Sequence, residues 1–99
     1  MNEQDFYAEG AAKAAALLRA LGNEHRLLVL CLLLEHGEMT VGMLQAHVAL
    51  SPSALSQHLA RMREEGLVAF RREAQTLYYR LQREEIVPVI AALKAIFCP

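Results

Sequence analysis

The chain has 99 residues, of which 55% are hydrophobic, and a formal net charge of −1. A chain of this length is expected to form one domain, residues 1–99, with surplus apolar surface for a second subunit to cover. The longest apolar run, residues 27–34, is too short to span a bilayer, and residues 2–5 lack the positive start of a signal peptide. We therefore expect a cytoplasmic protein without a membrane segment.

Charge is distributed unevenly along the chain. Residues 1–50 carry three Lys or Arg against six Asp or Glu, whereas residues 51–83 carry six Arg against three Glu. The local charges of these two segments are thus −3 and +3. A positive segment attracts the phosphates of nucleic acid even when the whole chain is slightly acidic.

Two helices are predicted in the N-terminal third. Residues 4–21 form a helix ended by Gly22, and residues 24–36 form a second helix, capped by Asn23 and ended by Gly37. The second helix holds the long apolar run and is expected to be buried on all sides. The apolar stripe of the first helix comprises Tyr7, Ala11, Ala14, Leu17, Leu18 and Leu21.

A pair of shorter helices follows. Thr40 caps a helix that reaches Val48, and Ser51 caps another that ends at Gly66 and has Pro52 at its first position. The short connection between them predicts a helix-turn-helix. Side chains expected to face inward are Val41, Leu44 and Val48 from the first of the pair, and Leu55, Leu59 and Met62 from the second.

The polar arc of the Ser51 helix is rich in groups that hydrogen-bond base edges and phosphates. Steps of 100° per residue place Ser53, Ser56, Gln57, Arg61 and Glu64 opposite the apolar stripe. An ordinary solvated helix draws on Lys and Glu, so the arc favours a DNA-recognition helix. The alternative is an amphipathic surface helix without that role.

The periodicity changes from helical to alternating after Gly66. Residues 67–72 and 76–81 are β-branched, aromatic and arginine-rich, and residues 73–75 separate them. They predict an antiparallel hairpin, although its turn lacks the usual glycine. A basic hairpin after a recognition helix is a wing that reaches DNA, through Arg71, Arg72 and Gln75. A plain two-stranded ribbon is the alternative.

A last helix is predicted over residues 84–98. Pro88 must lie near its first turn or kink it. Its apolar stripe and that of the first helix lie outside the DNA-reading unit, so we expect a homodimer through these terminal helices. The stripe comprises Ile86, Val89, Ile90, Leu93, Ile96 and Phe97.

This order of helices and wing resembles the ArsR/SmtB family of dimeric winged-helix repressors, and the resemblance covers nearly the whole chain. It implies a mainly α fold of five helices with a β-hairpin wing, and double-stranded DNA with an inverted-repeat operator as the partner. The motifs that carry it are residues 21–27, residues 51–59 with Arg63, residues 66–68, and Tyr78 with Tyr79.

Many members of that family bind metals, so the family's ligand positions matter in this sequence. The third-helix cysteines of the family would fall near Thr40 and Gly42, and neither is Cys. Residues 84–99 contain no His or Asp for a C-terminal-helix site. The four histidines, at 25, 36, 47 and 58, stand eleven apart and make no chelating pair. We expect no metal and no cofactor.

The two cysteines carry a further resemblance. Cys31 in the second helix, Cys98 at the end of the last helix and the wing residues 73–79 resemble the BigR/SqrR/HlyU subgroup. This resemblance implies a dithiol switch that senses reactive sulfur species or oxidants and lowers DNA affinity. Composition alone makes Cys31 a small core side chain.

The sequence thus predicts a DNA-binding repressor and not an enzyme, since it shows no nucleophile–base pair and no phosphate-cradling glycine loop. Two alternatives stay open: a repressor with an unrecognised metal or organic effector, and a dimeric module whose helix 51–65 binds protein. The predicted DNA-binding residues are Ser51, Ser53, Ser56, Gln57, His58, Arg61, Arg71, Arg72 and Gln75.

Overall fold

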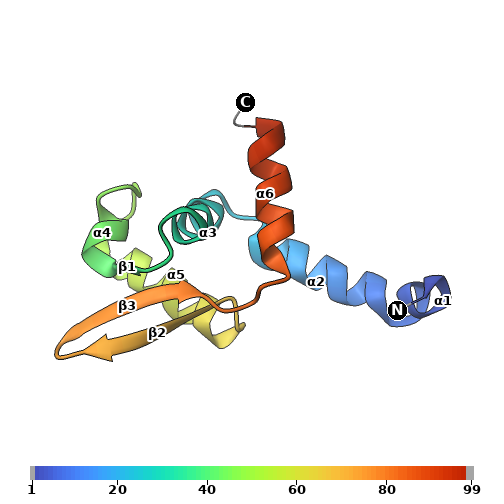
Figure 1. Cartoon of the computed structure of the whole chain (residues 1–99), viewed down its shortest axis with the longest axis horizontal. Coiled ribbons are helices and arrows are strands. Elements are labelled where there is room, and N and C mark those ends of the chain that lie inside the picture. The colour runs from blue at the N-terminus through green and yellow to red at the C-terminus, as the bar shows by residue number, and fades with distance from the viewer. Residues whose placement is uncertain (1, 98–99) are drawn as a thin grey trace.

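A computed structural model describes residues 2–97. The N-terminal helical segment begins with α1 (Glu3–Asp5), capped by Asn2, passes through the π-helical stretch η1 (Phe6–Gly10) and continues as α2 (Ala11–Leu21). The backbone keeps right-handed helical angles at both junctions, so the predicted first helix is present as one segment (Figure 1). Its N-terminal half extends away from the rest of the chain.

The central helix is α3 (Glu24–His36), and its ends match the prediction. The Asn23 side chain accepts hydrogen bonds from the amides of His25 and Arg26, and Gly37 ends the helix with a φ of 82°. The prediction that this helix is buried on all sides is wrong for one of its faces. Leu28 is 38% exposed and Cys31 is half-buried, because no other element within residues 2–97 covers that face completely. The buried apolar residues of α3 are Val29, Leu30, Leu32 and Leu33.

The predicted helix-turn-helix is formed by α4 (Val41–Gln45) and α5 (Pro52–Glu64). The Ser51 hydroxyl accepts a hydrogen bond from the Ala54 amide at 3.2 Å, and Gly66 has the left-handed φ of 75° that the stop signal requires. The Gln45 side-chain amide donates to the Leu50 carbonyl and ties the turn to α4. Of the predicted inward residues, Val41 is half-buried, and the other five are buried: Leu44, Val48, Leu55, Leu59 and Met62.

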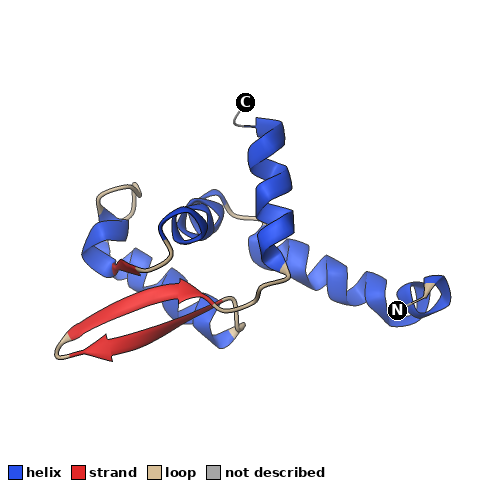
Figure 2. Cartoon of the chain, viewed as in Figure 1, coloured by secondary structure: helices blue, strands red, loops and turns tan. Residues whose placement is uncertain are grey.

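Three antiparallel strands form the sheet, in the order β1-β3-β2. The wing hairpin consists of β2 (Val68–Glu73) and β3 (Thr76–Leu81), with Arg71 opposite Tyr78 and Glu73 opposite Thr76. The two-residue strand β1 (Met39–Thr40) pairs with the middle of β3, where Met39 is opposite Tyr79. The sequence pattern does not predict this third strand. Figure 2 shows the hairpin extending beyond the helices at one end of the molecule.

The C-terminal helix α6 (Ile86–Phe97) returns from the wing and packs on α3 through the buried Ile86 and Ile90. Pro88 is its third residue, as expected for a proline in the first turn. Among the described residues, no helix is both long and apolar enough to cross a membrane.

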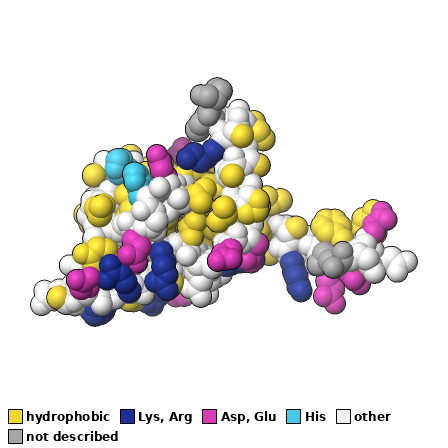
Figure 3. Space-filling view, in the orientation of Figure 1, with side chains coloured by type: hydrophobic (Ala, Val, Ile, Leu, Met, Phe, Trp, Pro, Cys, Tyr) yellow, Lys and Arg dark blue, Asp and Glu magenta, His cyan; other side chains and the backbone are white. Residues whose placement is uncertain are grey.

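Large apolar side chains remain exposed on the terminal helices. Tyr7 and Leu18 are 70% and 62% exposed, and Ile96 and Phe97 at the far end of α6 are 66% and 75% exposed. In Figure 3, hydrophobic side chains line the free edge of α6 and gather again near the N-terminus. The terminal helices therefore carry apolar surface that the described part of the chain leaves exposed.

Candidate nucleic-acid interface

The outer face of α5 presents the polar residues predicted to read DNA. Leu55, Leu59 and Met62 anchor the helix in the core, so the residues opposite them face solvent. His58 is half-buried at the edge of this face, and Ser51 caps the helix as well as lying at its exposed start. The exposed residues of this face that were predicted to bind DNA are Ser51, Ser53, Ser56, Gln57 and Arg61.

One flank of α5 packs against the N-terminal end of α3. Arg26 is 8% exposed, and its guanidinium donates to the Ala20 carbonyl at 3.1 Å and to the Glu65 carboxylate at 3.4 Å. The rings of His25 and His58 lie 6.1 Å apart on the same flank. Partial burial and the positive charges of Arg26 and its neighbours lower the pKa of His58.

The other flank of α5 contacts the base of the wing. The guanidinium of Arg63 lies 4.7 Å from the centre of the Phe70 ring, and Phe70 in turn packs beside Tyr79. This cation–π contact and the buried Leu67 and Val68 hold the hairpin against the recognition helix. Helix and wing therefore form one continuous surface.

The two wing arginines predicted to contact DNA, Arg71 and Arg72, differ in their surroundings. Arg71 donates to both oxygens of Glu38, at 3.0 and 3.2 Å, and to Glu73 at 2.7 Å, and its guanidinium lies over the Tyr78 ring. Hydrogen bonds to Glu38 and Glu73 hold the pKa of Arg71 above its usual range. Arg72 points to the opposite face of the hairpin, by strand alternation, and has no ion pair within residues 2–97. Its charge is available to a phosphate.

The wing tip is a two-residue turn, Ala74-Gln75, one residue shorter than predicted because Glu73 continues β2. Ala74 has a φ of 56°, a left-handed value that costs a side-chain-bearing residue more than glycine. Gln75 is exposed beside it. The turn thus forms without the glycine that hairpin patterns normally show.

Of the two predicted switch cysteines, one can be placed. Cys31 is half-buried on the less covered face of α3, the face that also carries Leu28. Cys98 lies outside the described residues. Within residues 2–97, no three His, Cys, Asp or Glu side chains come together as a metal site would require.

Sequence reasoning missed the residues that hold the reading surface together. The sequence does not predict that Glu38 binds the wing, and the Arg26–Glu65 pair joins positions 39 residues apart. A signal was present for Arg26, since a charged residue beside the apolar run of α3 must be exposed or paired. Its partner could not be named without the fold.

Comparison with known proteins agrees with this architecture. Residues 23–69 match the helix-turn-helix domain of the arsR family of bacterial regulatory proteins. The chain is 47% identical to the transcriptional activator HlyU of Vibrio cholerae over 98 residues, which are 99% of this chain and 89% of HlyU. These relatives are transcriptional regulators and not enzymes.

Solved structures show the same fold. Reduced HlyU from Vibrio cholerae superimposes with a TM-score of 0.87 at 45% identity, over 96% of this chain and 99% of that one. The transcriptional repressor BigR from Xylella fastidiosa gives a TM-score of 0.88 at 35% identity, over 100% and 99%. The predicted winged helix and the family resemblance are confirmed. The chain belongs to the arsR family of bacterial regulatory proteins and is a winged-helix transcriptional regulator.

Proposed function

We propose that the chain is a cytoplasmic repressor that binds, as a homodimer of single-domain subunits, an inverted repeat in double-stranded DNA. The observation that carries the proposal is the exposed Ser, Gln and Arg face of α5, held on both flanks by packed neighbours. Gln57 is suited to the paired donor and acceptor of adenine, and Ser53 and Ser56 suit base edges or phosphate oxygens. The similarity to the BigR repressor supports repression.

The exposed apolar residues of the terminal helices support the homodimer. A two-fold pair would place one α5 in each of two successive major grooves, so half-sites should lie about 10 bp apart. The test combines a gel shift on the DNA upstream of the chain's own coding region with light scattering at micromolar concentration. We expect a dimer that slows the migration of this DNA in the gel. An excess of unlabelled DNA of the same sequence should compete for the dimer. A monomer, or binding indifferent to sequence, would overturn the proposal.

We further propose that oxidation of Cys31 and Cys98 releases the DNA. The half-buried position of Cys31 on the less covered face of α3 supports access to its thiol, and a similar protein, HlyU, has been solved in a reduced form. Physical chemistry alone does not make Cys31 unusually reactive, since neighbouring leucines disfavour a thiolate. The role rests mainly on the subgroup resemblance.

Either of two oxidant classes, a peroxide or sulfane sulfur, can link the two cysteines in a balanced reaction. A peroxide oxidises the Cys98 thiolate to a sulfenic acid, and the Cys31 thiol displaces its oxygen as water to form a disulfide. With sulfane sulfur, two thiols and two sulfur atoms give a trisulfide and one molecule of hydrogen sulfide. A direct disulfide needs α-carbons within about 7 Å, whereas a trisulfide bridges a longer gap.

Serine substitutions test the switch. Cys31→Ser and Cys98→Ser should each bind the upstream DNA as the wild type does, yet fail to release it under peroxide or persulfide. Addition of dithiothreitol to the oxidised wild type should restore binding, which is the control for irreversible damage. If either variant releases DNA like the wild type, the cysteines act only in packing.

A further inference from the structure

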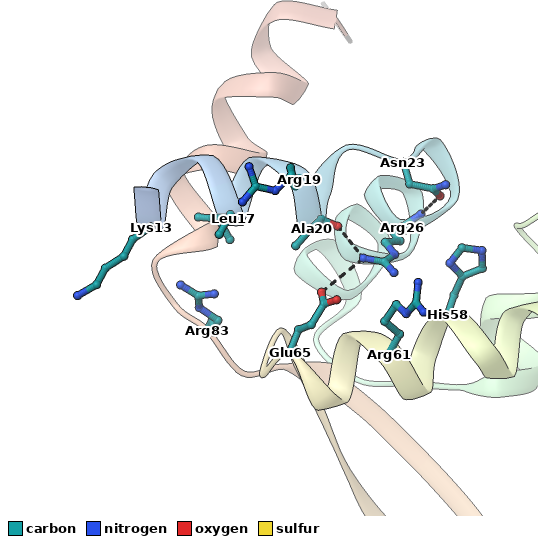
Figure 4. A pocket seen from close by; sticks show the side chains of 11 residues that line it. Lys13, Leu17, Arg19, Ala20, Asn23, Arg26, His58, Arg61, Glu65 and Arg83 are labelled. Atoms are coloured by element: carbon teal, nitrogen blue, oxygen red, sulfur yellow. Dashed lines mark hydrogen bonds and ion pairs between the residues drawn. The ribbon is translucent and has the colours of Figure 1, made fainter. Parts of the chain in front are cut away.

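A basic groove runs beside the recognition helix and extends from Arg61 on α5 to residues outside the predicted DNA-binding set. It encloses about 840 Å³ between α2, α5, the N-terminal end of α3 and the segment that joins the wing to α6. Figure 4 shows side chains from all four elements around it. Among residues 2–97, one carboxylate lines it, that of Glu65, against five cationic side chains: Lys13, Arg19, Arg26, Arg61 and Arg83.

The charges in the groove are not balanced by its own acidic residue. Glu65 is already paired with Arg26, while Lys13 and Arg83 have partners, Glu9 and Glu85, that do not line the groove. Arg19 and Arg61 make no ion pair within residues 2–97 and are exposed. Two unneutralised guanidiniums on one concave surface form a site for an anion.

The groove continues onto the reading face of α5. A second, smaller hollow of about 320 Å³ shares Arg26, His58 and Arg61 with it and adds Gln57, a predicted base-reading residue. An α-helix with its side chains fills a major groove about 12 Å wide, so a sugar–phosphate strand must pass along each of its flanks. The wing lies on the Arg63 flank of α5, and the basic groove lies on the Arg61 flank.

We propose that this groove seats the phosphates of the DNA strand that passes on the Arg61 flank of α5, with Arg19 and Arg61 as the principal contacts. The inference rests on the proposed DNA binding and extends its surface to α2, outside the helix-turn-helix and the wing. The chemistry recognised is a phosphate oxyanion, which could also come from a free anionic ligand. The continuity of the groove with the hollow that holds Gln57 and Arg61 favours the DNA strand.

The test measures DNA affinity against salt for Arg19→Gln in the full-length chain. Removal of one phosphate contact should reduce the slope of log K against log salt by about 0.9, and affinity between about 50 and 200 mM salt should fall for specific and unrelated DNA alike. Lys94→Gln removes one positive charge from α6, which does not line the groove, and is the matched control. Light scattering checks that both variants keep the wild-type mass.

A second readout follows the histidine ring signals by NMR. Partial burial lowers the pKa of His58, and the positive charges of Arg26, His25 and Arg61 lower it further. Seated phosphates should raise this pKa toward its usual value, because they offset those positive charges. The rise on DNA binding should be smaller in Arg19→Gln than in the wild type. Inorganic pyrophosphate, added without DNA, serves as the probe for a free-anion site.

The outcomes separate the two proposals. A wild-type chain that fails to bind its upstream DNA would overturn the proposed function. Wild-type binding with an unchanged salt slope in Arg19→Gln would overturn the groove assignment alone. A third outcome would also overturn the groove assignment. If the wild type binds pyrophosphate saturably, Arg19→Gln abolishes that binding and the salt slope of DNA binding is unchanged, the groove binds a free anion.

Discussion

The reading unit, residues 24–81, and the terminal helices differ in how much of their apolar surface is buried within the chain. In the reading unit, side-chain caps begin α3, α4 and α5, and the inner residues Leu44, Leu55 and Leu59 are buried within the chain. The terminal helices bury their inner residues, such as Leu21 and Ile90, but leave Leu18 and Ile96 in solvent. The first region buries most of its apolar surface within one chain, apart from Leu28 and Met43, and the second has the composition of an interface.

The largest expected effect comes from placing a charge on the terminal helices. Leu18→Glu should give a monomer at micromolar concentration and weaken binding to an inverted repeat by about 10²–10⁴-fold, because the two half-sites are then bound independently. Light scattering and gel shift measure the two effects. Met43→Glu is the matched control, since Met43 is also exposed but lies on α4. If Met43→Glu were monomeric, or if Leu18→Glu stayed dimeric, the terminal helices would not be the dimer interface that sets them apart from the reading unit.

Within the reading unit, Gln57→Ala should cost about 1–3 kcal/mol of specific binding and relax the preference for one base pair. Gln57 is exposed on α5 and its side chain supports no packing in the core, so the dimer and the melting temperature should stay unchanged. Competition binding against operators substituted one base pair at a time provides the measurement. An equal loss of affinity for every operator sequence would mean that Gln57 contacts only the DNA backbone.

The wing arginines give a smaller, paired prediction. Arg72→Ala should weaken binding to all sequences and lower the salt slope by about 0.9 for each phosphate that Arg72 neutralises. Arg71 is occupied by Glu38 and Glu73, so Arg71→Ala should change this slope less and act by loosening the wing. Anisotropy titrations across salt concentrations compare the two variants. A larger slope change for Arg71→Ala would reverse this assignment.

The smallest effect is expected at the wing tip. Ala74→Gly should raise the free energy of unfolding by about 0.5 kcal/mol, because relief of the left-handed strain exceeds the added entropy of the unfolded chain. Urea denaturation measures it. Gln75→Gly is the control and should be neutral or destabilising, since Gln75 is not among the positive-φ residues.

Local signals explain what could be predicted from the sequence. Asn23, Ser51 and Gly66 act within one helical turn, so the ends of α3 and α5 could be assigned without any knowledge of the fold. The burial of Leu55, Leu59 and Met62 followed from helical periodicity alone. Periodicity failed for Leu28, because it cannot show which face of an apolar helix its neighbours leave open.

Interactions between distant segments explain what could not be predicted. β1 has only two residues and forms because β3 offers a free edge, and no local pattern marks such a strand. The basic groove draws its cations from α2, α3, α5 and the segment before α6. Lys13 and Arg83 are far apart in sequence, so their common site depended on the packing of four elements.

The pairing of β1 with β3 has a consequence for exchanging wings between relatives. The middle of β3 is joined to Met39 and Thr40, and Glu38 binds Arg71 at the same level of the hairpin. A transplanted hairpin of residues 68–81 would therefore arrive without the strand and the carboxylate that orient it. A functional graft would have to include residues 38–40 as a second, non-contiguous piece.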